Sequence, residues 1–137
     1  MKSFLNNHPN LGMWLIAISA LGMFIIFIMS MINTISYKKI VKLYMDKYTR
    51  LPITAALAKE ASLIATPGAY HAKIGFIMGS LILPYNKITN HDMTREQYDY
   101  INGLPLKLTI GFRIEAFLWG VIGAGMVVGF ILEFFIK

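Results

Sequence analysis

The sequence predicts an all-α membrane protein: two transmembrane helices in an antiparallel hairpin, with a cytoplasmic helical insert between them. Three observations predict this fold. Residues 11–35 carry no charge, a second long apolar stretch covers 108–136, and lysines and arginines follow the first stretch and precede the second. An α-helix rises about 1.5 Å per residue, so each stretch can cross a hydrocarbon core of about 30 Å.

The composition supports the same class. Of the 137 residues, 56% are hydrophobic and only 15% are charged, whereas soluble domains average about 25% charged residues. The net charge is +6, but the cations flank an apolar span, where anionic lipid headgroups meet them. We therefore expect a lipid bilayer and no nucleic acid as a partner. The absence of cysteine excludes disulfides, thiolate metal sites and cysteine nucleophiles.

The first span, 11–35, is too long for the apolar region of a signal peptide, which is about 7–15 residues. We interpret it as an uncleaved helix whose basic flank lies in the cytoplasm. Residues 1–10 then form a short external tail, and both termini lie outside a multi-pass protein of the cell inner membrane. The residues expected at the lipid headgroups are Lys38, Lys39, Lys42, Lys47 and Arg50.

The cytoplasmic insert is predicted over 36–107. The first helix continues to about Thr49–Arg50, and a second helix runs from Pro52 to about Thr66. Thr94, with Gln97 three residues later, has the spacing of a capping box and predicts a short helix over 95–101.

An uncharged apolar segment, 74–83, lies inside the insert and covers about half a bilayer at helical rise. It could be an interfacial helix, a re-entrant half-span or a helix packed on its neighbours. A third span over Ala61–Leu83 is the remaining alternative. That span would place two net-positive segments on opposite sides of the membrane, which disfavours it.

The second span, 108–136, follows Pro105 and is rich in small residues. Small residues spaced four apart allow close helix packing in lipid. The predicted packing residues are Gly120, Ala124, Gly125 and Gly129 on this span, with Ala17 and Ala20 on the first. The face they form could contact the chain's own first span, a second copy of the chain or a larger membrane protein.

Possible intramembrane polar residues are Arg113, Glu115 and Glu133. A carboxylate inside a bilayer suggests an ion or proton path, but all three residues lie near span ends, where snorkelling to the interface is the favoured interpretation. No histidine pair has metal-ligand spacing, and no nucleophile–base pattern or phosphate-binding loop is present. We expect no enzyme activity, no metal and no cofactor.

The predicted function is therefore helix–helix contact with a larger membrane partner, as an accessory subunit or as an immunity protein against a pore-forming toxin. One alternative is a self-assembling pore or channel. The two-span layout is also similar to that of small bacterial proteins such as universal stress protein B, although no specific motif is shared. That resemblance makes a membrane-anchored stress-response protein a further alternative.

Overall fold

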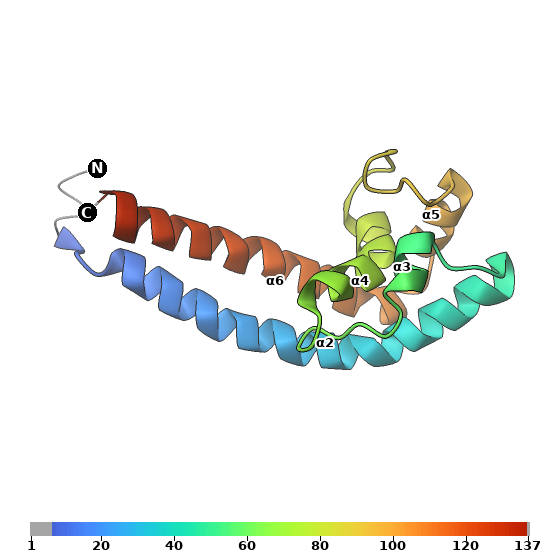
Figure 1. Cartoon of the computed structure of the whole chain (residues 1–137), viewed down its shortest axis with the longest axis horizontal. Helices are drawn as coiled ribbons and strands as arrows, with labels where there is room; N and C mark the ends of the chain where they lie inside the picture. The colour runs from blue at the N-terminus through green and yellow to red at the C-terminus, as the bar shows by residue number, and fades with distance from the viewer. Residues whose placement is uncertain (1–6, 137) are drawn as a thin grey trace. The chain divides into compact units, whose positions relative to one another are not determined.

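The computed structural model describes residues 7–136, and within that range helices are joined by loops and turns, with no strand (Figure 1). Most of the predicted external tail, 1–10, lies outside the described residues. The helices are α2 (Leu11–Tyr48), α3 (Ile53–Leu57), α4 (Pro67–Ile82), α5 (Arg95–Asn102) and α6 (Leu106–Ile131), followed by a π-helical turn over Leu132–Ile136.

Two helical segments within the described range, Leu11–Tyr48 and Leu106–Ile136, are long and apolar enough to cross a membrane by length and composition. Helix α4 has 16 residues and is not among them. The chain divides into two compact units. Unit 1 combines residues 7–28 with 117–136, and unit 2 covers Met29–Ala116.

Helix α2 ends where the sequence predicts. Thr49 follows Tyr48 with φ of 60°, and its amide donates to the Met45 carbonyl at 2.8 Å. The left-handed conformation is common just after a helix, but it is unusual for a β-branched residue. The start of α6 also agrees with prediction, because Leu106 follows Pro105 directly.

The predicted helix from Pro52 to Thr66 is wrong beyond Leu57, where α3 ends. Side chains capture the backbone groups that a longer helix would use. The Ala65 amide donates to Ser62 Oγ at 3.1 Å, and the Ser62 amide donates to Thr66 Oγ1 at 3.2 Å. Serine and threonine compete with helical hydrogen bonds in this way. Pro67 then opens α4 in the first helical turn, where proline has no amide to lose.

Helix α4 accounts for the apolar segment 74–83. Its buried side chains join a core in unit 2 that also includes residues of α2 and α6, namely Tyr37, Ile40, Tyr44, Ile74, Phe76, Ile77, Leu81 and Phe112. The segment thus packs on its neighbours, the third of the four alternatives. Burying these side chains removes apolar surface from water, at about 25 cal/mol per Å², so lipid is not needed to explain their composition.

Helix α5 begins with the capping box predicted from Thr94 and Gln97. The Gln97 amide donates to Thr94 Oγ1 at 3.3 Å, and the Thr94 amide donates to Gln97 Oε1 at 2.8 Å. Two amides without helical partners are thereby satisfied. The helix ends at Asn102, before Gly103, as the sequence indicates.

In unit 1, the α2 segment 11–28 and the α6 segment 117–131 run side by side in opposite directions (Figure 1). Gly12 lies against Gly129, and Gly22 lies against Ile122. Burial on α6 follows a seven-residue interval through Ile122 and Gly129. A seven-residue interval is typical of two helices packed along a shared face.

A carboxylate in the loop before α5 is hydrogen-bonded to α3 in unit 2. Asp92 Oδ2 accepts from the Thr54 amide at 3.0 Å and from the Thr54 hydroxyl. Burial alone would raise the pKa of Asp92, but the Thr54 hydrogen bonds outweigh it and hold the pKa below the ordinary value.

We therefore predict acid sensitivity at this link. A lowered folded-state pKa stabilises the protein above the unfolded value of about 3.9 and is lost as pH falls through the folded value. The Thr54 amide chemical shift should titrate below about pH 4, at the pKa of Asp92. Asp92→Asn should abolish that titration, and because the group is partly exposed it should cost at most about 1 kcal/mol near neutral pH. If the Thr54 amide signal still titrated in Asp92→Asn, the titration could not be assigned to Asp92.

Candidate functional site: a buried polar cluster around Glu115

The most unusual polar group in unit 2 is the Glu115 carboxylate, whose residue is 0% exposed. Three helices supply its surroundings. The Asn33 side chain on α2 donates from Nδ2 to Glu115 Oε2 at 2.6 Å. The Tyr70 hydroxyl on α4 donates to Glu115 Oε1 at 2.9 Å. Each carboxylate oxygen therefore accepts from a different helix.

The donors themselves are buried. Asn33 is 2% exposed and Tyr70 is 5% exposed. The Ser30 hydroxyl on α2 is also buried and lies near enough to the Tyr70 hydroxyl to influence its pKa. Burial raises the pKa of Tyr70 well above its ordinary value; the Ser30 hydrogen bond opposes this increase and Glu115 adds to it. Tyr70 therefore remains a protonated donor at all ordinary pH values.

Helix α6 leaves room for this cluster at Gly111. A Cβ atom at that position would collide with Asn33 Oδ1 and would lie 3.0 Å from Asn33 Cγ. Glycine at position 111, four residues before Glu115, is thus required for the Asn33 amide to pack directly against the α6 backbone. The spacing of four places Gly111 and Glu115 on the same face of the helix.

The buried position of Glu115 corrects the prediction that its carboxylate snorkels to the interface. Arg113, two residues before Glu115, has other partners. The Arg113 guanidinium donates to the Leu81 carbonyl at 3.2 Å and to Asn102 Oδ1 at 3.4 Å. Residues two apart on a helix point in different directions, so Arg113 holds the ends of α4 and α5 instead.

The four predicted packing residues on α6 separate into two faces. Gly125 and Gly129 face α2 within unit 1: a Cβ at Gly125 would lie 2.8 Å from Ser19 Oγ, and one at Gly129 would lie 3.0 Å from the Gly12 carbonyl oxygen. A Cβ at Gly120 would have no atom within 4 Å, and Ala124 is exposed.

On α2, the predicted packing residues Ala17 and Ala20 are exposed, which leaves them for a contact outside the chain. The residues next to α6 in unit 1 are Gly12, Ile16, Ser19 and Gly22. Small size alone suggested the alanines, but helix rotation decides which small residues meet. Ser19 and Ile26 are both buried, seven residues apart, and this spacing was the better signal.

Among the predicted headgroup residues, Lys38, Lys39, Lys42 and Arg50 are exposed on unit 2. Lys47 is engaged within the protein. Its Nζ lies 3.6 Å from Glu96 Oε1 and 4.6 Å from the Tyr100 ring centroid. This residue is therefore less available to lipid than the others.

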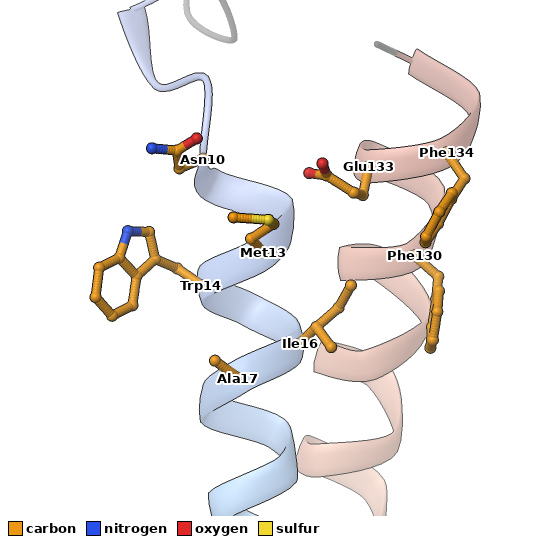
Figure 2. Close-up of a pocket in the computed structure, with 8 residues that line it drawn as sticks. All are labelled: Asn10, Met13, Trp14, Ile16, Ala17, Phe130, Glu133 and Phe134. Atoms are coloured by element: carbon orange, nitrogen blue, oxygen red, sulfur yellow. The ribbon is translucent and has the colours of Figure 1, made fainter.

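A groove of about 670 Å³ lies in unit 1, near Glu133. Figure 2 shows the Glu133 carboxylate turned towards α2, while Trp14 points away from α6. The Glu133 carboxylate packs close to Gly12, where a Cβ would lie 2.9 Å from Oε2. The lining residues are Asn10, Met13, Trp14, Ile16, Ala17, Phe130, Glu133 and Phe134, and most of them are apolar.

Sequence reasoning missed Asn33, Ser30 and Tyr70. A signal was present for the first two, because they are polar residues in or beside an uncharged apolar span, and polar groups there commonly carry function. No local signal joins Tyr70 to them, since it is 37 residues beyond Asn33 and reaches the cluster only through the packing of α4. No group of three or more histidine, aspartate or glutamate side chains in the described part of the chain could hold a metal ion.

Comparison of the sequence with models of protein families and with curated proteins finds no match, and comparison with solved structures finds none either.

Proposed function

We propose that the chain is a small non-enzymatic integral protein of the inner membrane that acts through helix–helix contact with a larger membrane protein. The observation that carries the proposal is the open face of α6 around Gly120 and Ala124. No atom lies within 4 Å of a Cβ at Gly120, and the neighbouring Phe117 and Val121 are 70% and 54% exposed.

This face is suited to another helix for a physical reason. Lipid offers no hydrophobic drive for helix association, so close backbone approach and van der Waals contact decide it. The inward Gly125 and Gly129 already provide that contact within unit 1. A second small-residue face beside large apolar side chains supports contact with a helix outside the chain. An accessory subunit and an immunity protein both need such a surface and no catalytic group.

The proposed topology has both termini outside and residues 36–107 in the cytoplasm. Because the chain contains no cysteine, single cysteines can report it without background. An impermeant maleimide added to intact cells should label Asn7→Cys and should leave Lys87→Cys unlabelled until the membrane is opened. Both residues are exposed. Labelling of Lys87→Cys in intact cells would overturn the topology.

The partner can be trapped by a photoreactive amino acid at Ala124 in the full-length protein in its own membrane. A discrete heavier adduct, identified by mass spectrometry, is expected. The same group at Ile26, which is 0% exposed, is the matched control and should give no such adduct. If only lipid were crosslinked, the proposal would be contradicted. An adduct of twice the chain mass would show that the partner is a second copy and not a larger protein. Sensitivity of a deletion strain to a rival strain would select the immunity form.

A self-assembling pore is the alternative function, and the burial of Glu115 disfavours one form of it. Glu115 is enclosed by Asn33 and Tyr70 of its own chain, so it is not available to line a passage between copies. Conductance in planar bilayers that changed in Glu133→Gln would support a pore lined elsewhere. A membrane-anchored stress-response role has no structural observation in its favour.

The exposed lysines at 38, 39 and 42 support a second contact, with anionic lipid headgroups at the inner leaflet. Each basic residue near such a surface contributes about 1 kcal/mol, and salt screens the attraction beyond about 8–10 Å. Binding of a peptide covering residues 36–50 to anionic vesicles should weaken steeply with salt. Its triple Lys→Gln variant should bind weakly at every salt concentration.

A further inference from the structure

The hydrogen bonds around Glu115 form a chain that can run in either direction. As the structure places the groups, Tyr70 donates to Glu115 Oε1 at 2.9 Å, and the buried Ser30 hydroxyl lies beside Tyr70. A hydroxyl both donates and accepts, whereas an ionised carboxylate only accepts. The direction of the chain therefore depends on whether Glu115 carries a proton.

With Glu115 ionised, Ser30 donates to Tyr70 and Tyr70 donates to the carboxylate. With Glu115 protonated at Oε1, its O–H donates to the Tyr70 oxygen and the Tyr70 O–H turns to donate to Ser30. Asn33 Nδ2 donates to Oε2 in both states, at 2.6 Å in the structure. Hydronium in the solvent gives up the proton and Glu115 gains it, so the Tyr70 and Asn33 side chains remain hydrogen-bonded to the carboxyl group in both states.

We propose that Glu115, held by Asn33 and Tyr70, is a reversible proton-binding site. A buried polar group without a partner costs about 1–3 kcal/mol. The Tyr70 hydroxyl can donate to the ionised carboxylate and accept from the protonated one, while the Asn33 amide donates to the other oxygen in both states. The site depends only on the packing of unit 2, not on any partner of the Gly120 face.

Other ionisable groups on α2, α4 and α6 lie near Glu115 and its hydrogen-bond partners, and most of them have partners of their own. On α2, Tyr37 and Lys38 follow Asn33, and the Tyr37 ring lies 4.8 Å from Lys73 Nζ. On α4, Lys73 donates to the Ala61 carbonyl at 2.9 Å, and His71 adjoins Tyr70 with ring centroids 5.7 Å apart. On α6, Arg113 is bound to Leu81 and Asn102. Because these neighbours include an imidazole and a phenol, the readout must be specific for carboxyl groups.

Infrared difference spectroscopy meets that requirement, because a protonated carboxyl group has a C=O band that histidine lacks. The full-length protein in lipid nanodiscs should show a buried carboxyl band that appears reversibly as the pH is lowered from about 10 to about 4. The band should shift in protein labelled with ¹³C at glutamate. It should be absent from Glu115→Gln and retained in Asp46→Asn, whose exposed carboxylate is the matched control.

Tyr70→Phe provides a second test that keeps the carboxyl group. It removes the hydrogen-bond chain to Ser30, so the midpoint of the Glu115 band should move by about one pH unit, since hydrogen bonds to charged groups are the stronger ones. This variant decides the matter if Glu115→Gln does not fold. A Glu115 carboxyl band that is constant throughout the pH range, or a midpoint identical in Tyr70→Phe, would overturn the proposal.

Discussion

Gly111→Ala is expected to destabilise unit 2 by about 2–3 kcal/mol, because the added methyl group occupies the position of the Asn33 amide oxygen. Asn33 would have to turn away, and its hydrogen bond to Glu115 at 2.6 Å would be lost. Leaving a buried carboxylate without one of its donors is among the costlier single changes in a protein. The measurement is the midpoint of reversible unfolding in detergent micelles.

Gly75→Ala is the matched control, since the same methyl group on α4 would have no atom within 4 Å. Replacing a helix glycine by alanine where the added methyl group meets no neighbour should stabilise by up to about 1 kcal/mol. A double-mutant cycle tests the mechanism: in an Asn33→Ala background the colliding oxygen is absent, so Gly111→Ala should cost little. Additive effects of the two substitutions would show that the collision with Asn33 is not the cause.

Gly129→Val is expected to separate the two helix segments of unit 1. Its Cβ would lie 3.0 Å from the Gly12 carbonyl oxygen and 3.1 Å from the Ile16 amide nitrogen, and backbone atoms cannot move aside as a side chain can. Overpacking of this kind costs about 1–3 kcal/mol or more. Spin labels on cysteines introduced at the exposed Leu21 and Val121 should report a longer and broader distance distribution by electron–electron resonance.

Gly120→Val is the matched control for this experiment, because it adds the same atoms to the same helix where no neighbour is present. The label distance should remain unchanged, while photo-crosslinking of the partner from Ala124 should be reduced. The two variants thus distinguish the inner face from the outer face. An unchanged distance in Gly129→Val would contradict the packing of α6 on α2 in unit 1.

Much of the local structure was predictable because it depends on short-range chemistry. The end of α2, the start of α6 after Pro105 and the capping box of α5 are each determined by a few neighbouring residues. The exception is the helix predicted to reach Thr66. There, the Ser62 and Thr66 side chains form hydrogen bonds with the backbone, and helical periodicity gave no sign of this competition.

The candidate site was predictable only in part. Glu115 was identified from the sequence as a carboxylate at the edge of an apolar span, but snorkelling was the wrong interpretation. Residues seven apart on one helix lie on the same face, so the inward face of α6 could have been found from the spacing of Ile122 and Gly129. The partners Asn33 and Tyr70 come from two other helices, at separations of 82 and 45 residues.

The sequence by itself determined that the chain is helical, that two of its segments are apolar and long enough to cross a bilayer, and that cations lie beside them. Those properties depend on the composition of a segment or on residues close together in the sequence. Only the tertiary structure decided which small residues meet, that α4 is a core helix and that the Glu115 carboxylate is buried between two donors. These depend on the rotation and register of helices distant in the chain, which are set by how all their side chains pack together.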